Sequence, residues 1–457
     1  MRKLLLALGV LLAVGSALGA ELRARRPGTI LFKLKPNAST ASRASLLAAL
    51  RSLHSQSAMG PGQKALLLQD SRLQVCVCSA NHGAEEKACD RLMASGAVQF
   101  AQPDYVVAPC QVVPNDPGFG YEWWQWDIDA PHAWEQTTGN RSVLVAVCDT
   151  GFDLHHPDLS PNFVLPGYNV VDGSEDVTPL YSHGTCVAGL IGAAGNNGVG
   201  VAGVAWQVSL LPIKISSPLL TGGRAFVSDI VAGIVYAANR GAQIVNLSFD
   251  AAGLGPINEA ADYLRGRGGL LIVSAGNEDV DPGYTDYPGF LAIGATGSGM
   301  LQDLHLPSNY GTFVDMVAPG DLLYTTGDAE PYTYFAGTSA SAAVVSGVAS
   351  LVAALNPRFT PANIETVIRQ SCLDIGPPGE DAVYGRGRIS ASAAIDMTAG
   401  DLNRDGAVNQ ADYLAFRASL GSSLDQPTYN PLADYDGDGR VSYSDYTIWY
   451  QCYRARL

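Results

Sequence analysis

The chain has 457 residues, of which 47% are hydrophobic and 16% are charged, and its formal net charge at pH 7 is −15. This length exceeds what one hydrophobic core usually serves, so we expect two or three domains. The acidic charge disfavours nucleic acid and anionic membrane surfaces as partners, and it favours solubility and the binding of cations.

Residues 1–20 have the pattern of a secretory signal peptide. Arg2 and Lys3 precede an apolar run over residues 4–14, and small residues then lead to Ala20. A membrane anchor is the alternative, but the run is shorter than the ~20 residues that span a bilayer. We therefore expect a secreted, extracellular protein with no integral membrane span. Export permits disulfides, but the spacing of the eight cysteines leaves their pairing open and shows no CxxC-type metal site.

The segment 28–108 predicts a small α/β domain. Strand-like and helical patterns alternate along it, at residues 29–34, 41–53, 73–77, 84–94 and 98–104. The order strand, helix, strand, helix, strand indicates a sandwich with a core of its own.

The longer segment 116–398 alternates short apolar strands with helical stretches. Its clearest strand patterns are continuous runs of Val, Ile and Leu at residues 143–147, 208–213, 244–247 and 270–273. Such runs, separated by helices, predict a parallel sheet covered by helices on both faces. A charge-free stretch over 332–357 is rich in Ser, Thr, Gly and Ala, and it predicts a buried helix. After Asp401 the composition becomes acidic and rich in glycine, which indicates a separate small unit over 400–457.

Three polar motifs stand at element ends, where doubly wound folds place their chemistry. Asp149 ends an apolar strand, His183 begins a helix of small residues, and Ser339 follows a glycine turn into the charge-free helix. A serine hydroxyl needs an adjacent base, and a histidine can act as that base near neutral pH. A buried carboxylate fixes the histidine tautomer and stabilises the imidazolium. Each motif alone is consistent with an ordinary turn or helix cap, but the set predicts a nucleophile, its base and an orienting acid.

In their order Asp, His, Ser, these motifs resemble the subtilase family of serine proteases. The resemblance covers about residues 115–397, and it includes Ser274-Ala275-Gly276-Asn277-Glu278 directly after an apolar strand. It implies an α/β, subtilisin-like fold, an oxyanion donor at Asn277, and a secreted endopeptidase that cleaves protein or peptide substrates through an acyl-enzyme on Ser339. The segment 28–108 resembles the inhibitory propeptide of this family.

The chain departs from the family pattern around the catalytic residues. After Ser339 the family usually reads Met-Ala-Ser-Pro-His, whereas this chain has Ala340-Ser341-Ala342-Ala343-Val344. The packing of the helix after Ser339, and the side of the cleft that binds the leaving group, are therefore expected to differ from the family pattern. Cys148 precedes the acid and Cys186 follows the base, and we interpret both as small buried hydrophobic residues.

The resemblance also implies substrate-binding residues. The family pattern Ser-Leu-Gly-Gly is replaced here by Ser248-Phe249-Asp250-Ala251, so an acid stands at the rim of the cleft in place of glycine. With Glu278 nearby, two carboxylates would line the primary pocket and favour cleavage after Lys or Arg. A broad apolar pocket with a solvated acid is the equal alternative.

A calcium ion is often held in this family by a carboxylate after the catalytic Asp and by a loop in the histidine helix. The corresponding residues here are Asp158 and Asn197, and backbone carbonyls would complete an oxygen-rich site. A metal-free Asn-Asn-Gly turn is the alternative.

Two acidic loops repeat 33 residues apart (434 minus 401). Both match the EF-hand calcium loop at positions 1, 3, 5, 9 and 12 with Gly at position 6, although position 12 is Asp and not Glu. With the backbone carbonyl of position 7, the predicted ligands are Asp401, Asn403, Asp405, Ala407, Asn409 and Asp412 in the first loop, and Asp434, Asp436, Asp438, Arg440, Ser442 and Asp445 in the second. The loop–helix pair resembles a dockerin module. It implies two Ca2+ sites and calcium-dependent docking to a cohesin-type scaffold protein through Gln410, Ala411, Tyr443 and Ser444.

Two other functions are consistent with part of this pattern. A calcium-dependent adhesion or scaffold component could carry a degenerate subtilase domain, and a non-proteolytic hydrolase could use the same three residues. The intact set of Asp149, His183, Asn277 and Ser339 favours the protease.

Overall fold

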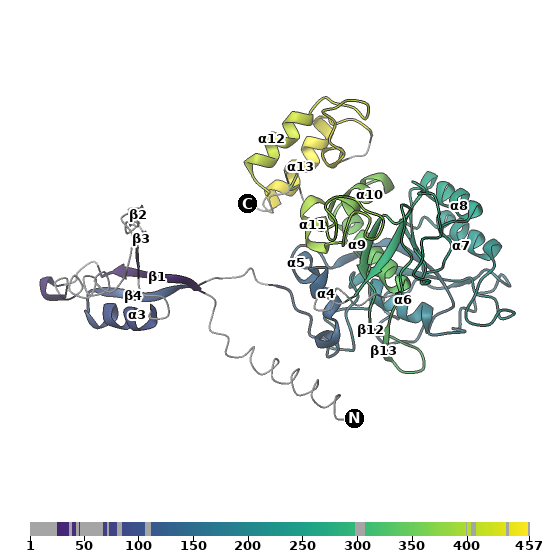
Figure 1. Cartoon of the computed structure of the whole chain (residues 1–457), viewed down its shortest axis with the longest axis horizontal. Coiled ribbons are helices and arrows are strands. Elements are labelled where there is room, and N and C mark those ends of the chain that lie inside the picture. The colour runs from purple at the N-terminus through teal and green to yellow at the C-terminus, as the bar shows by residue number, and fades with distance from the viewer. Residues whose placement is uncertain are drawn as a thin grey trace. The chain divides into compact units, whose positions relative to one another are not determined.

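A computed structural model of the chain describes residues 25–35, 39–42, 45, 67–70, 73–79, 85–105, 111–297, 307–398, 400–403, 408–435 and 438–455. The predicted signal peptide, most of the predicted helix 41–53, and the predicted ligands Asp405, Ala407 and Asp436 lie outside these residues. The chain divides into two compact units, residues 1–110 and 111–457, which are described separately (Figure 1).

The first unit contains an antiparallel sheet with the strand order β2-β3-β1-β4. Its elements are β1 (Arg25–Leu34), β2 (Leu67–Asp70), β3 (Leu73–Ser79), α3 (Glu85–Ala94) and β4 (Val98–Tyr105). Ile30 and Phe32 of β1 are buried together with Leu92 of α3, and α3 contacts both β1 and β4. The strands predicted at 29–34, 73–77 and 98–104 and the helix predicted at 84–94 are confirmed.

A seven-stranded sheet forms the centre of the second unit, in the order β11-β10-β9-β8-β5-β7-β6. All its strand pairs are parallel. The strands are β5 (Gly139–Asp149), β6 (Tyr168–Asn169), β7 (Gln207–Lys214), β8 (Ile244–Leu247), β9 (Leu270–Ser274), β10 (Phe290–Thr296) and β11 (Met316–Pro319). The four predicted strands are confirmed as β5, β7, β8 and β9, whereas β6, β10 and β11 were not predicted.

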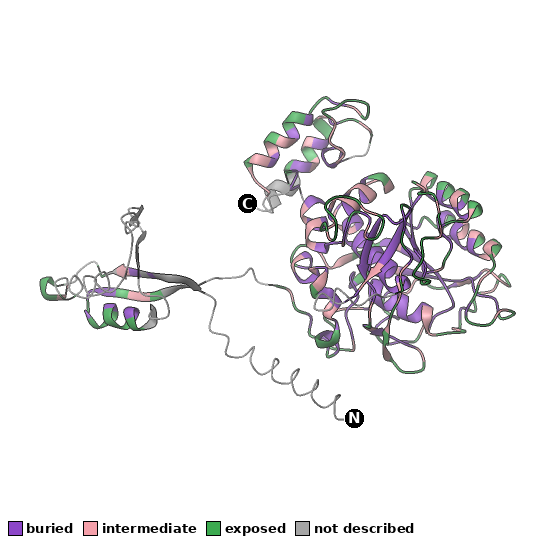
Figure 2. Ribbon diagram, in the orientation of Figure 1, coloured by how far each residue is buried: buried purple, intermediate pink, exposed green. Residues whose placement is uncertain are grey.

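Helices cover both faces of this sheet, as the sequence predicts. Val145 and Val147 of β5 pack on the face with α6 (His183–Gly192) and α9 (Thr338–Leu355). Ala146 and Cys148 alternate with them and pack on the opposite face, with α7 (Val227–Asn239) and α8 (Gly255–Gly266). Because a strand presents successive side chains to opposite faces, a continuous apolar run is required for burial on both sides. Figure 2 shows the buried interior of the sheet and its helices.

Helix α9 is the predicted charge-free helix, and it is buried from Thr338 to Ala353. Among the described residues it is the one helix long and apolar enough to cross a membrane, but 89% of its apolar window is buried inside the protein. Small side chains permit this close packing. For example, a Cβ on Gly347 would lie 2.5 Å from Cβ of Val204.

The remaining elements surround the sheet or follow it. They are η1 (Phe119–Tyr121), α4 (Trp123–Asp127), α5 (Ala130–Ala133), the antiparallel hairpin of β12 (Leu323–Thr326) and β13 (Tyr332–Phe335), α10 (Pro361–Gln370), α11 (Ala391–Thr398), α12 (Gln410–Ser419), η2 (Pro431–Ala433) and α13 (Tyr443–Ala455). The helix predicted after each acidic loop is confirmed as α12 and α13. Phe416 of α12 and Trp449 of α13 are buried and stack on each other, with ring centroids 5.9 Å apart.

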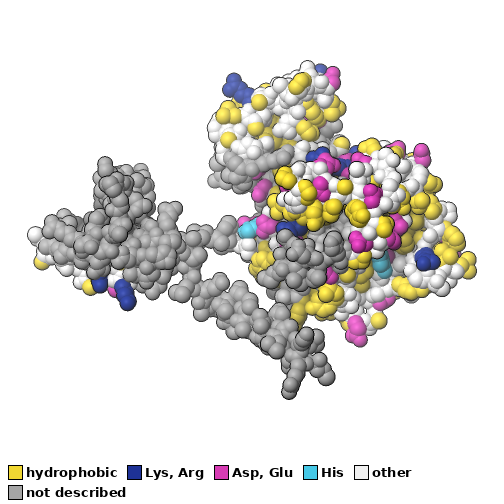
Figure 3. All heavy atoms as spheres, viewed as in Figure 1, with side chains coloured by type: hydrophobic (Ala, Val, Ile, Leu, Met, Phe, Trp, Pro, Cys, Tyr) yellow, Lys and Arg dark blue, Asp and Glu magenta, His cyan; other side chains and the backbone are white. Residues whose placement is uncertain are grey.

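Acidic side chains are spread over the visible face of the second unit, with Lys and Arg in a few places (Figure 3). This distribution agrees with the formal net charge of −15. Among the side chains coloured on this face in Figure 3, Lys and Arg form no large surface that would attract a polyanion.

Candidate active site

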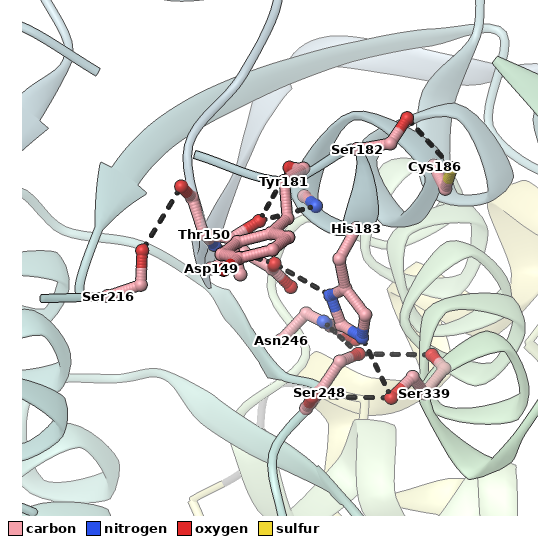
Figure 4. A network of polar contacts seen from close by, with 11 residues as sticks. Asp149, Thr150, Tyr181, Ser182, His183, Cys186, Ser216, Asn246, Ser248 and Ser339 are labelled. Carbon is pink, nitrogen blue, oxygen red and sulfur yellow. Dashed lines mark hydrogen bonds and ion pairs between the residues drawn. The ribbon is translucent and has the colours of Figure 1, made fainter. Parts of the chain in front are cut away.

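The three predicted catalytic residues lie together at the carboxyl end of the sheet. Asp149 is the last residue of β5, His183 the first of α6, and Ser339 the second of α9. His183 Nδ1 lies 2.7 Å from Asp149 Oδ1, and His183 Nε2 lies 3.1 Å from Ser339 Oγ (Figure 4). Because a carboxylate only accepts hydrogen bonds, the imidazole proton lies on Nδ1, and Nε2 is free to accept the serine proton.

Strand order explains why these residues meet. After β5 the chain adds β6 and β7 on one side of that strand, and it then adds β8, β9, β10 and β11 on the other side. The ends of β5 and β8 therefore flank a topological switch point, where parallel sheets open a crevice for ligands. Asp149 ends β5, and Ser248 directly follows β8.

Local contacts fix the Asp149 carboxylate, which is fully buried. The N–H of Thr150 donates to Asp149 Oδ1 at 2.7 Å. Thr150 Oγ1 in turn accepts the N–H of Gly184 at 3.1 Å and donates to the Tyr181 carbonyl at 2.9 Å. A Cβ on Gly184 would lie 2.3 Å from the Gly151 carbonyl oxygen, so only glycine after His183 lets α6 approach the end of β5 this closely.

The environment of His183 has opposing effects on its pKa. Burial alone would lower it, but the charge of Asp149 and its hydrogen bond together outweigh burial, so the pKa of His183 is raised above its usual 6.5. The ring also makes T-shaped contacts with Phe335 and Phe249, whose centroids lie 5.1 and 6.2 Å away. His183 is therefore oriented on both sides and remains a stronger base than a free imidazole.

A buried hydrogen-bond network holds the turn at residues 337–339, which we call the nucleophile turn after the role predicted for Ser339. Ser346 Oγ donates to Asn246 Oδ1 at 2.9 Å, and Asn246 Nδ2 donates to Ser248 Oγ at 2.9 Å. Ser248 Oγ then donates to the Ser339 carbonyl at 3.0 Å. The Ser339 hydroxyl has a second acceptor besides His183, the Ser248 carbonyl at 3.3 Å. The predicted substrate-binding residue Ser248 thus contacts the nucleophile directly, whereas Asn246 and Ser346 were not predicted.

Asn277 lies beside the nucleophile turn. Its Oδ1 accepts the N–H of Thr338 at 2.9 Å and the Thr338 hydroxyl at 3.1 Å. A backbone N–H can only donate, so Oδ1 must face Thr338, and Nδ2 remains as a donor for a ligand. Gly337 has φ +112°, and a Cβ there would lie 3.0 Å from Asn277 Oδ1. The sequence predicts Asn277 but does not reveal its partner Thr338.

The two acids of the predicted substrate pocket are exposed and close enough to interact electrostatically. Burial raises the pKa of Asp250, and the negative charge of Glu278 raises it further. The pKa of Tyr284 is raised by burial and then by the charges of both acids. Asp250 and Glu278 therefore form one region of negative potential.

The predicted pair Asp158 and Asn197 is in contact, since Asn197 Nδ2 donates to Asp158 Oδ1 at 2.9 Å. The sequence did not predict that two more buried carboxylates belong to this region. Asp116 accepts the N–H of Asn196 at 2.6 Å, and Glu122 accepts the N–H of Ala202 at 3.0 Å. Burial raises the pKa of Glu122 well above its usual value, and the charges of Asp116 and Asp158 add to this effect. Within the described ranges, no group of three or more His, Cys, Asp or Glu side chains is arranged to hold a metal ion. Calcium here would need amide and carbonyl oxygens as well.

The C-terminal loops bury the acids at their first and last positions, Asp401, Asp412, Asp434 and Asp445. Asp412 accepts the N–H of Asn409 at 2.7 Å, and Asp445 accepts the N–H of Ser442 at 2.7 Å. In each loop, the carboxylate at position 12 thus accepts a hydrogen bond from the backbone N–H at position 9 and closes the end of the loop. Two buried carboxylates in each short loop concentrate negative charge and oxygen ligands, which fits a site for a cation.

The cysteines near the catalytic residues are poor nucleophiles. Cys148 and Cys186 are buried, free thiols. Burial raises the pKa of Cys186 to about 12 and raises that of Cys148 further. The reactive thiolate is therefore suppressed at neutral pH in both, which agrees with their interpretation as small hydrophobic residues.

Comparison with known proteins agrees with this geometry. Residues 140–387 match the model of the subtilase family, and residues 399–449 match the dockerin type I domain. The chain is 34% identical over 293 residues to the thermophilic serine proteinase of Bacillus sp. (strain AK1), covering 63% of this chain and 71% of the relative. It is 31% identical over 285 residues to thermitase of Thermoactinomyces vulgaris, covering 62% of this chain and 99% of the relative.

A similar solved structure is that of a protease from Pseudoalteromonas arctica. It has a TM-score of 0.55 and 27% sequence identity, and the match covers 63% of this chain and all of that chain. The family match spans more than half of the 457 residues and includes the Asp149, His183 and Ser339 positions. The chain therefore belongs to the subtilase family of serine proteases, with a dockerin type I domain on its C-terminal side.

Proposed function

We propose that this subtilase is a secreted endopeptidase that cleaves proteins through an acyl-enzyme on Ser339. The observation that supports this most strongly is the continuous contact from Asp149 through His183 to Ser339, at 2.7 and 3.1 Å. Ser339 Oγ attacks the scissile carbonyl carbon while its proton passes to His183 Nε2. His183 then gives that proton to the leaving amine. Finally, it activates a water molecule that hydrolyses the acyl-enzyme.

Two donors are proposed for the oxyanion of the tetrahedral intermediate. Asn277 offers Nδ2, because its Oδ1 is held by Thr338. Ser339 is the second residue of α9, so its own N–H belongs to the first turn, where backbone donors have no partner within the helix. Asp149 holds the Nδ1 tautomer and stabilises the imidazolium as the charge develops. A degenerate adhesion component would not need to keep these contacts.

Substrate preference is proposed from the acids at the pocket. Burial raises the pKa of Asp250 most, and the charge of Glu278 raises it further, so the two carboxylates repel each other. A positive side chain before the scissile bond would relieve this repulsion, so we propose cleavage after Lys or Arg. The alternative is a broad apolar pocket in which Asp250 is solvated, since the apolar Phe249 directly precedes Asp250 in the same loop.

The C-terminal loops are proposed to bind two calcium ions and to dock the enzyme on a cohesin-type partner outside the cell. The support is the pair of buried carboxylates in each loop and the dockerin match over 399–449. Asp401, Asn403, Asn409 and Asp412 would supply oxygens in the first loop, and Asp434, Asp438, Ser442 and Asp445 in the second. When bound, calcium would neutralise the repulsion between these acids. Asp158 and Asn197 are proposed as part of a further site, and the segment 28–108 is proposed as an inhibitory propeptide.

A serine-directed fluorophosphonate distinguishes the protease from a degenerate domain. The purified chain should be labelled, and it should cleave a denatured protein, because His183 activates the Ser339 hydroxyl. Ser339→Ala should abolish both labelling and cleavage, while Ser341→Ala, two residues along α9, should keep the labelling. Labelling that is absent from the parent chain, or unchanged in Ser339→Ala, would contradict the assigned nucleophile.

The pH dependence of kcat/KM should report the raised pKa of His183. Neutral His183 is the active base, so activity should fall as the pH drops through a pKa above 6.5. Asp149→Asn should move this fall in activity to lower pH, because both effects that raise the pKa of His183 are lost. It should also lower kcat by about 10⁴-fold, the effect of this change in an unrelated serine protease. If the fall in activity stayed at the same pH in Asp149→Asn, Asp149 would not be the residue that raises the pKa of His183.

Profiling with a peptide library should show preference for Lys and Arg before the scissile bond. Asp250→Gly should lower kcat/KM on those substrates by about fivefold, or ~1 kcal/mol for a solvent-exposed charge pair. Glu175→Gln removes an equal charge from another exposed loop and should leave the preference unchanged. Equal or better cleavage after Phe or Leu by the parent enzyme would favour the apolar pocket.

Calcium removal should unfold the C-terminal loops and leave the sheet intact. Hydrogen exchange of Ser339→Ala with and without a chelator should show loss of protection in α12 and α13, because unneutralised buried carboxylates repel each other. Protection in β5 and β8 should persist. Adding Asp401→Ala and Asp434→Ala to the Ser339→Ala chain should give low protection of α12 and α13 even when calcium is present. If the protection of α12 and α13 were the same with and without the chelator, calcium would not be a structural ligand of these loops.

A further inference from the structure

The loop that carries Asn277 is held by a residue from another part of the chain. Asn309 lies between β10 and β11, and only 3% of its surface is exposed. Its Oδ1 accepts the N–H groups of Glu278 at 3.1 Å and Val280 at 3.2 Å, and its own N–H donates to the Gly276 carbonyl at 2.9 Å. Asn309 therefore bonds the backbone on both sides of Asn277.

The Glu278 side chain adds a second connection. Since backbone donors occupy Oδ1 of Asn309, its Nδ2 must face away from them, and it donates to Glu278 Oε2 at 2.7 Å. The same Oε2 accepts the N–H of Asn277 at 3.0 Å. Glu278 is exposed, so these two donors, and not packing in the core, determine where its carboxylate lies.

The backbone of Gly276 is adapted to this arrangement. It has φ +102°, and a Cβ on it would lie 2.3 Å from Asn309 Nδ2 and 2.9 Å from Glu278 Oε2. Any larger residue would separate the two polar groups, so the glycine permits the contact between them.

We infer that Asn309 and Glu278 are positioning residues that orient Asn277 as the oxyanion donor, an inference that rests on the proposed function of Asn277. Asn309 and Glu278 fix the Asn277 backbone, while Thr338 fixes its side-chain oxygen. Only Nδ2 then remains to meet the charge that develops on the substrate. Donors contribute most to such a transition state when they are held in place before the reaction begins.

Glu278 therefore has two functions in one side chain. One carboxylate oxygen orients the oxyanion loop, and the net charge contributes to the negative potential at the pocket. Changes to Glu278 should affect turnover for every substrate, whereas changes to Asp250 should affect the choice among substrates.

A double-mutant cycle tests the inference, with kcat and KM measured on one peptide substrate. Asn277→Ala alone should lower kcat by roughly 10²–10³-fold, the cost measured for loss of such a donor in subtilisin. Asn309→Ala should lower kcat roughly tenfold with KM within about twofold, because the donor is misplaced but not removed. In the Asn277→Ala background, Asn309→Ala should cost less than about twofold, since no donor remains to be oriented.

Two further variants make the test independent of folding effects in the core. Glu278→Ala changes an exposed side chain and should reproduce the kcat loss of Asn309→Ala, again only when Asn277 is present. Asp279→Asn removes the neighbouring negative charge and should leave kcat unchanged. The affinity for a peptide boronate, which forms a tetrahedral adduct, should fall by the same factor as kcat in both Asn309→Ala and Glu278→Ala.

The outcomes separate the inference from the function on which it rests. Equal losses from Asn309→Ala with and without Asn277, or a loss confined to KM, would overturn the positioning role while leaving Asn277 as the donor. Unchanged kcat in Asn277→Ala would overturn the proposed oxyanion donor itself. The expected non-additivity in kcat, matched by the boronate affinity, would support both.

Discussion

The burial of the Asp149 carboxylate at the end of β5 determines much of the active-site arrangement. A fully buried charge is costly unless hydrogen bonds and a partner compensate it. Here the compensation comes from the Thr150 N–H and from His183 Nδ1, both on the same oxygen. Helix α6 must therefore begin directly over the strand end. Once the imidazole is fixed there, its other nitrogen reaches Ser339 without further adjustment.

The sheet brings together groups that are distant in the sequence. The site uses the ends of β5, β8 and β9 and the first residues of α6 and α9. Since parallel strands all end at the same edge of a sheet, five separate segments converge at the switch point between β5 and β8. Hydrogen bonds from the loops after β8 and β9 to the first turn of α9 then refine the positions, as between Ser248 and Ser339 or between Asn277 and Thr338.

The sequence predicts those parts of the site that have a local pattern. The strands β5, β7, β8 and β9 contain apolar runs; Asp149 ends one of them, His183 begins a helix of small residues, and Ser339 follows a glycine turn. Asn309 and Glu122 could not be found in this way, because their roles depend on contacts with residues 276–280 and Ala202 that no periodicity records. Thr338 and Asn246 are ordinary polar residues until the fold places them next to the nucleophile turn. The repeat of 33 residues, by contrast, is visible in the sequence and correctly indicates α12 and α13.

Helix α9 carries the proposed nucleophile on its first turn and is buried from Thr338 to Ala353. Ser346, two turns further along, contributes to the network that reaches Ser339. Loosening of the core around α9 would therefore move Ser339 relative to His183, so the geometry of the site cannot be separated from the stability of the core.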